Sequence, residues 1–169
     1  MENIEFPENF PAPDEYLIEL GRIAALWGSL ESSVNVALIK LSGIDDIDGW
    51  RVHVLTVHSN FKQKVDCIET LCHRMQEQFP HLSMYKDTVK VIQKAQTRRN
   101  HFLHNGLFYN SESGQVETSS MQARGILKTK IEKVTVSDLK SISALIHLSL
   151  LSIHELVTGM KYPPVWERG

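Results

Sequence analysis

The sequence has few of the residues that would support disulfide or metal–cysteine chemistry. Its 169 residues include only two cysteines, Cys67 and Cys72. Residues five apart on a helix point in different directions, so these thiols are poorly placed to bridge each other. We therefore expect reduced thiols in a cytoplasmic protein. The sequence also lacks a glycine-rich phosphate loop, a Gly-x-Ser-x-Gly elbow and a paired-cysteine zinc pattern.

A long uninterrupted apolar run is missing as well. The richest late stretch, residues 142–157, is interrupted by His147, His154 and Glu155, so we expect no membrane span. The first 13 residues show no basic-then-apolar signal pattern. A formal net charge of -2 argues against a general nucleic-acid coat protein but leaves room for a local basic site.

The first half of the chain predicts helices after an extended arm. Three prolines favour an extended arm over residues 1–13. Apolar residues then recur at spacings of three and four, which predicts a long helix from Asp14 to a C-cap at Gly43. A second helical region is expected over residues 50–79, with Ser59-Asn60 as a candidate break and Pro80 as its end.

The second half predicts a helix, a β insertion and a last helix. The third helix should cover about residues 82–105 and stop at Gly106. Residues 107–109 and 131–136 have strand-like composition, and residues 111–114 have the composition of a turn, which together are typical of a small, irregular β-hairpin or meander over about residues 107–136. The last helix should begin with Thr135 or Ser137 as N-cap and be followed by a tail over 161–169.

These elements together predict a mainly all-α fold. We expect an up-and-down bundle of four or five helices with a small β-hairpin insertion before the last helix. A single domain should cover residues 14–160, since a chain of this length can bury a continuous core without disulfides or metals.

Arg99 is anomalous because it lies on the apolar line of the third helix. That line consists of Leu82, Tyr85, Val89, Ile92, Gln96, Arg99 and Leu103. Burying an unpaired guanidinium costs several kcal/mol, so Arg99 needs a carboxylate, a water-filled cleft or a phosphate. Glu31, at the edge of the first helix's apolar line, is the candidate carboxylate. A structural ion pair and a functional arginine oriented by Glu31 both remain open.

His104 follows Arg99 by five positions. On an ideal helix this separates the two by roughly 140°, so they do not share a face. A symmetric dimer would solve this if each subunit contributed Arg99 and His104 to one cleft. Asn100 and His104 do share a face, and Asn100 would orient the imidazole or bind a substrate oxygen.

A basic ladder leads along the same helix to this segment. It consists of Lys86, Lys90, Lys94 and Arg98. The ladder is interpreted either as a phosphate track for RNA or as an ordinary solvated helix face. His101 would contact RNA beside it. His101 and His104 also have metal-compatible spacing, but no further ligand follows at a recognised distance, so we expect no metal site.

The segment resembles the Arg-x4-His motif of the HEPN superfamily. The matching residues are Arg99-Asn100-His101-Phe102-Leu103-His104, including the polar residue directly after the arginine. The helical layout over about residues 14–160 is similar too. Arg98 also gives Arg-x5-His with His104, so the register of the motif stays open.

The resemblance implies a homodimer whose motif helices form a composite cleft. Many members resemble metal-independent endoribonucleases that are toxins, neutralised by a protein antitoxin, or phage-defence effectors; others only bind RNA or are structural. Carried over, Arg99 would stabilise the scissile phosphate, His104 would transfer protons and Asn100 would support them. We therefore expect a cofactor-free RNase that cleaves by 2′-OH attack. The alternative is a non-catalytic helical dimer that binds RNA or protein.

Overall fold

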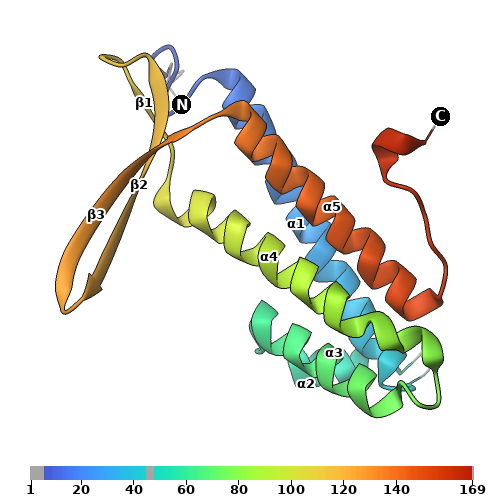
Figure 1. Cartoon of the computed structure of the whole chain (residues 1–169). Helices are drawn as coiled ribbons and strands as arrows, with labels where there is room; N and C mark the ends of the chain where they lie inside the picture. The colour runs from blue at the N-terminus through green and yellow to red at the C-terminus, as the bar shows by residue number, and fades with distance from the viewer. Residues whose placement is uncertain (1–5, 45–47, 169) are drawn as a thin grey trace, which may run out of the picture. The chain divides into compact units, whose positions relative to one another are not determined.

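The computed structural model describes residues 6–44 and 48–168. It is mainly helical and has one three-stranded antiparallel sheet in the order β1-β2-β3. The described elements are α1 Asp14–Leu41, α2 Trp50–Thr56, α3 Phe61–Met75, η1 Pro80–Met84, α4 Tyr85–Asn105, β1 Phe108–Asn110, β2 Gln115–Arg124, β3 Ile126–Val134, α5 Val136–Thr158 and η2 Val165–Glu167 (Figure 1).

The chain divides into two compact units. The first joins the described residues of Met1–Ala24 with Gln96–Ser143, and the second joins those of Ala25–Ala95 with Ala144–Gly169. The first unit holds the sheet and the C-terminal end of α4. The second holds α2, α3 and the C-terminal tail. The expected single domain over residues 14–160 stays a prediction.

The helix predictions for the first half are largely confirmed. α1 covers Asp14–Leu41, and the second region is two helices, α2 and α3, separated by residues 57–60. Asn60 Oδ1 accepts from the Gln63 amide at 3.0 Å, while Gln63 Oε1 accepts from the Asn60 amide at 2.9 Å. This reciprocal capping box satisfies backbone donors that a new helix leaves unpaired, so the chain starts α3 there.

The predicted boundaries around Pro80 are wrong by several residues. α3 ends at Met75 instead of Phe79, and α4 begins at Tyr85 instead of Leu82. Proline disfavours helical backbone at the residue before it, and Phe79 is indeed non-helical, with φ -123° and ψ 87°. The segment Pro80–Met84 forms a 3-10 turn that still buries Leu82.

A hydrophobic cluster forms the core of the second unit. Cys72 lies in it, and burial raises the pKa of this thiol to about 11, so the group is protonated and unreactive at neutral pH. Cys67 is exposed, and both cysteines are free. The largest fully buried members of this cluster are Leu82, Ile68, Ile92, Ile153, Leu156, Val34 and Val65.

The β insertion lies within the predicted residues 107–136, but its strands are longer and more regular than predicted. β2 has ten residues and β3 has nine, and they form a twisted ribbon around the turn at Gly125 (Figure 1). Gly125 has φ +77°, a value that favours glycine. The sequence of residues 115–124 did not predict this strand, because most of its residues are polar. Both faces of the outer ribbon contact solvent, so the strand does not need alternating apolar residues.

The end of α4 is attached to the base of this ribbon. α4 ends at Asn105 as expected, and Gly106 adopts φ +68°. The Gly106 carbonyl accepts a hydrogen bond of 2.8 Å from Thr118 Oγ1, and Thr118 is 0% exposed. A carbonyl just beyond a helix end has no partner within the helix, so this hydrogen bond from the buried Thr118 joins β2 to the end of α4.

α5 begins at the first of the two predicted caps. The amide of Asp138 donates to Thr135 Oγ1 at 3.2 Å, and Asp138 Oδ2 accepts from the Thr135 amide at 2.9 Å. The helix then runs for 23 residues. Among the described residues α5 alone is long and apolar enough to cross a membrane, and 33% of its apolar window is buried. The absence of a membrane span stays a prediction.

The C-terminal tail is held against α5 through His147. The Val165 amide donates to His147 Nε2 at 3.1 Å, and the Trp166 ring packs edge-on against the imidazole with centroids 5.3 Å apart. Burial lowers the pKa of His147, and the positive charge of Arg168 lowers it further. The neutral imidazole is therefore the form that holds the tail.

Acidification should release this tail contact. Because the folded pKa of His147 lies below its ordinary value near ~6.5, the contact is complete above that pH and is lost as the pH falls through the lowered pKa. The Val165 amide signal in 15N NMR should move with this titration. In His147→Phe the signal should be independent of pH between about 4 and 8. A Val165 signal that stays constant in the unmodified protein contradicts the assignment.

Thr118→Val should destabilise the protein by about 1–3 kcal/mol, because it leaves the Gly106 carbonyl without its side-chain donor. Urea unfolding gives the free energy of unfolding. Thr129→Val is the matched control, since Thr129 is exposed on β3, and its change should be within about 0.5 kcal/mol. Equal losses in both variants would contradict a structural role for the Thr118 hydroxyl.

Candidate functional site

The predicted motif occupies the C-terminal part of α4, in the first unit. Arg99 and Asn100 are both half-buried there, and Arg99 Nη1 donates to Asn100 Oδ1 at 3.1 Å. Asn100 thus helps to hold the guanidinium that the sequence places on an apolar line. The expected contact between Asn100 and His104 stays a prediction, since the Asn100 oxygen is engaged with Arg99.

His104 is exposed in the last turn of α4. Exposure leaves the ring accessible to a ligand. A side chain in this position can exchange protons with a substrate or with water.

His101 links α4 to the third strand. His101 Nε2 lies 3.2 Å from Glu132 Oε2, and the other Glu132 oxygen lies 2.7 Å from Lys130 Nζ. The hydrogen bond from Lys130 holds the pKa of the Glu132 carboxyl below its usual range, and the charges of Lys130 and His101 lower it further. Glu132 is therefore ionised at neutral pH and bridges a strand lysine and a helix histidine.

Arg98 and Arg99 have different surroundings. Arg98 is exposed, and its guanidinium carbon lies 6.0 Å from the centroid of the Phe102 ring. The pKa of Asp138 is lowered mainly by hydrogen bonds from Thr135, with a smaller contribution from the charge of Arg98. Arg98 thus interacts with a ring on its own helix and with the start of α5.

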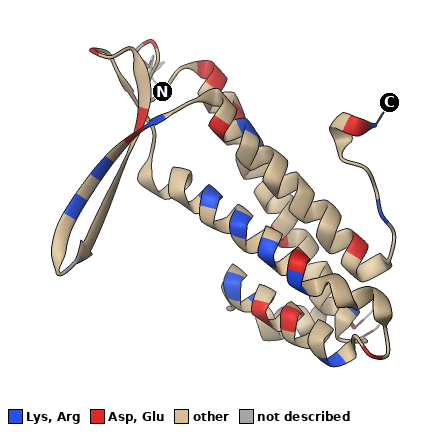
Figure 2. Ribbon diagram, in the orientation of Figure 1, with Lys and Arg blue, Asp and Glu red and all other residues tan. Residues whose placement is uncertain are grey.

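The basic ladder is solvent-exposed on α4. Lys86, Lys90 and Lys94 are exposed in the second unit, and Arg98 is exposed in the first. Figure 2 shows Lys and Arg recurring along this helix. Exposure is compatible with phosphate contacts and equally with a plain solvated face.

Glu31 is exposed on α1 in the second unit. Its Oε1 accepts a hydrogen bond of 2.8 Å from the Trp27 indole. The carboxylate therefore has a partner on its own helix. The pair between Glu31 and Arg99 stays a prediction.

The sequence did not predict which residues of other elements lie near the Arg99–His104 segment. Glu132 and Lys130 come from β3, and Asp138 comes from the first turn of α5. Only the strand register determines that Glu132 meets His101, and register cannot be read from a polar strand. The Asp138 cap had a local signal, because Thr135 and Asp138 have capping-box spacing.

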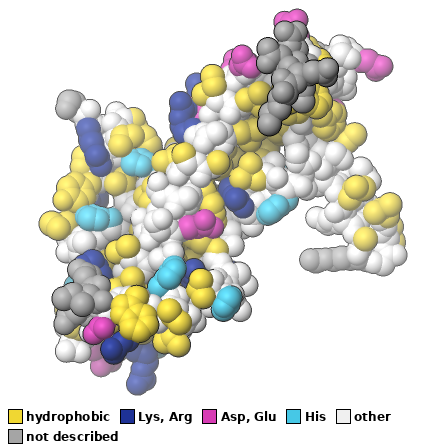
Figure 3. Space-filling view, turned by 180° about the vertical axis from the view of Figure 1, so that it is seen from behind, with side chains coloured by type: hydrophobic (Ala, Val, Ile, Leu, Met, Phe, Trp, Pro, Cys, Tyr) yellow, Lys and Arg dark blue, Asp and Glu magenta, His cyan; other side chains and the backbone are white. Residues whose placement is uncertain are grey.

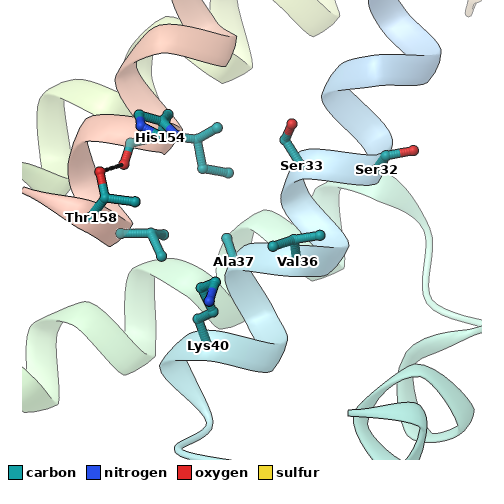
Figure 4. Close-up of a pocket in the computed structure, with 9 residues that line it drawn as sticks. Ser32, Ser33, Val36, Ala37, Lys40, His154 and Thr158 are labelled. Carbon is teal, nitrogen blue, oxygen red and sulfur yellow. Dashed lines mark hydrogen bonds between the residues drawn. The ribbon is translucent and has the colours of Figure 1, made fainter. Parts of the chain in front are cut away.

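A separate apolar pocket of about 290 Å³ lies in the second unit (Figure 4). Its volume is at the lower end for small-molecule sites. Polar atoms are few, and the Thr158 hydroxyl donates to the His154 carbonyl at 2.8 Å. The pocket is therefore suited to an apolar group more than to proton transfer. Its lining comes from α1 and α5 and comprises Ser32, Ser33, Val36, Ala37, Lys40, Ile153, His154, Val157 and Thr158.

Within residues 6–44 and 48–168, no group of three or more His, Cys, Asp or Glu side chains is arranged to hold a metal ion. Comparison of the chain with protein-family models, with curated proteins and with solved structures finds no match.

Lys130→Gln should raise the pKa of Glu132 towards its ordinary value, because the Lys130 hydrogen bond is the largest cause of the lowering. Carboxyl 13C NMR titration measures this directly. Lys133→Gln removes the same charge from the neighbouring part of β3 and should leave the Glu132 pKa almost unchanged. A larger shift in Lys133→Gln than in Lys130→Gln would contradict the assigned contact.

Proposed function

We propose that the chain is a HEPN-like, metal-independent endoribonuclease that cuts single-stranded or looped RNA. One observation carries the proposal: the end of α4 presents an exposed His104 five residues after Arg99, whose guanidinium is held by Asn100. This supplies a proton-transfer group and a phosphate-binding cation on one short segment. The HEPN motif contains the same pair at the same spacing.

The reaction uses a nucleophile that RNA itself provides. One His104 removes the proton from a 2′-OH, and the 2′-oxygen attacks the adjacent phosphorus. Arg99 binds the non-bridging oxygens and stabilises the added negative charge of the phosphorane. The bond to the 5′-oxygen then breaks, and a protonated imidazole supplies the proton to this leaving group. The products are a 2′,3′-cyclic phosphate and a 5′-hydroxyl.

A homodimer follows from the angular offset within one helix. Arg99 and His104 are separated by roughly 140° around α4, so one chain does not direct both at the same phosphate. Two copies of α4 facing each other would contribute one His104 as base and the other as acid. The proposal retains the predicted single helical domain over residues 14–160 with an up-and-down bundle.

Arg99 is the arginine of the motif in this proposal. Its contact with Asn100, the polar residue of the motif, supports the Arg-x4-His register. Arg98 packs over Phe102 instead and would contact the RNA backbone with His101, Lys90 and Lys94. Glu31 would orient Arg99 as a supporting carboxylate.

The cellular setting follows from the same resemblance. We infer a cytoplasmic toxin or phage-defence effector that needs no cofactor and spans no membrane. A protein antitoxin would be the natural partner, because an unrestrained RNase damages its own cell.

A second candidate function is a non-catalytic interaction module of the same fold. Exposed apolar side chains on and after α2 favour it, because contiguous apolar surface marks protein partners. These residues are Trp50, Val54, Leu55 and Val57. In this case His104 would have no role in turnover, and the protein would bind RNA or protein without cutting.

Cleavage of a labelled RNA in EDTA should separate the two functions. Wild-type protein should cut, and His104→Ala should lower the rate by about 10²–10⁴-fold because the proton-transfer group is lost. Arg99→Ala should lower it by about 10²–10³-fold because phosphorane stabilisation is lost. His154→Ala is the matched control, since His154 is also an exposed helical histidine, and its rate should be unchanged.

Circular dichroism must show that the variants are folded. Cleavage that persists in His104→Ala, or that stops when EDTA is added, overturns the mechanism. Binding without any cleavage by the wild type supports the interaction module.

A further inference from the structure

The β2–β3 ribbon has two chemically different faces. Residues directly opposite in an antiparallel pair share a face, and faces alternate along each strand. One face carries the outer cross-strand pairs Ser120–Lys130 and Gln122–Lys128, and the other carries Ser119–Ile131, Met121–Thr129 and Ala123–Leu127. The first is here called the polar face and the second the apolar face.

The polar face begins at the end of the motif helix. At its base Thr118 pairs with Glu132; Thr118 donates to the Gly106 carbonyl, and Glu132 contacts His101. Lys130 and Lys128 follow Glu132 on the same face at alternate positions. With a rise of about 3.3 Å per residue, Lys128 lies roughly 13 Å along the strand from Glu132.

The charged residues of the outer ribbon are all basic. Between residues 119 and 131 the sequence has three basic residues and no acidic residue, whereas the whole chain has a formal net charge of -2. Figure 2 shows the lysines on β3, and both Lys128 and Lys130 are exposed. A row of ammonium, amide and hydroxyl donors is complementary to phosphate oxygens.

We propose that the polar face of the β2–β3 ribbon holds the RNA strand that passes the end of α4. The occupant is single-stranded RNA, contacted through its phosphates by Lys128 and Lys130 and by the hydroxyl and amide of Ser120 and Gln122. This inference rests on the proposed function for the identity of the nucleic acid.

A protein partner fits this face less well than RNA does. Lysine is depleted in the cores of protein interfaces. The polar face carries one exposed apolar side chain among its outer pairs, Ile126 beside the Gly125 turn. The apolar face has the opposite character: Met121 is 72%, Leu127 67% and Ile131 61% exposed. Figure 3, seen from behind, shows hydrophobic side chains on this ribbon. A protein docked on the ribbon would therefore be expected on the apolar face.

The lysines of β3 provide a matched test. Lys128 lies on the polar face, while Lys133 lies on the opposite face, paired with Glu117. Both are exposed, and Lys→Gln removes one charge from the same strand in each case. Binding is measured by fluorescence anisotropy of a labelled 12-nucleotide RNA. The full chain carries His104→Ala, and EDTA is present, so that no turnover occurs.

Lys128→Gln should weaken binding roughly three- to tenfold at about 100 mM salt, and the slope of log K against log salt should become shallower by about 0.7. Lys133→Gln should change the affinity less than about twofold and leave the slope unchanged. Equal effects of the two variants overturn the proposal, because the ribbon would then act through net charge alone. An absence of any RNA binding overturns it too.

Cleavage by the same lysine variants, with His104 intact, separates this inference from the proposed function. If the wild type cleaves RNA and both lysine variants have the same KM, the polar-face site is overturned and the RNase proposal stands. If RNA binding depends on Lys128 but the wild type does not cleave RNA, the RNase proposal is overturned and the polar-face site stands. A change in oligomeric state on Lys128→Gln, measured by sedimentation without RNA, assigns the face to a second copy and overturns the proposal.

Discussion

The hydrogen bond from the buried Thr118 hydroxyl to the Gly106 carbonyl sets the arrangement around the candidate site. It attaches the base of the β2–β3 ribbon to the end of α4, where the helix leaves its carbonyls without partners. Because the side-chain period of a strand is two, this attachment also decides which face of the ribbon continues from α4. A slip by one residue would turn Lys128 and Lys130 away and bring the apolar face to the motif.

α4 has to satisfy two different environments along its length. In the second unit it buries Val89, Ile92 and Ala95, whereas its end in the first unit carries Arg99 and His104. Burying a charged group is costly unless it is hydrogen-bonded. The half-buried guanidinium of Arg99 donates a hydrogen bond to Asn100. The imidazole of His104 avoids the cost of burial because it is exposed. The segment can therefore be both anchored and accessible, which a catalytic or binding site requires.

The parts of the fold with local signals were predictable. The start of α1, the break at Asn60, the stop at Gly106 and the cap at Thr135 all depend on neighbouring residues, through helix periodicity, capping and the backbone freedom of glycine. The segment Arg99–His104 lies near the end of a helix, as these local signals predicted. Its placement at an exposed helix end followed from Gly106.

Non-local features were not predictable from one sequence. The length of the β2–β3 ribbon depends on pairing between polar strands, which carry little alternation to show it. The contact between His101 and Glu132 depends on register and on long-range packing. The hydrogen bond between Arg99 and Asn100 involves adjacent residues, but rotamers chosen in the packed structure determine it.

The chemistry of the cleaved RNA ends tests the central claim most directly. An RNA with a single ribonucleotide in a deoxyribonucleotide strand, incubated with wild-type protein in EDTA, restricts 2′-OH attack to one phosphodiester. The proposed mechanism predicts cleavage at that bond alone, with a 2′,3′-cyclic phosphate on one mass-spectrometric fragment and a 5′-hydroxyl on the other. Cleavage at deoxyribonucleotides, or a 3′-hydroxyl with a 5′-phosphate, would contradict it.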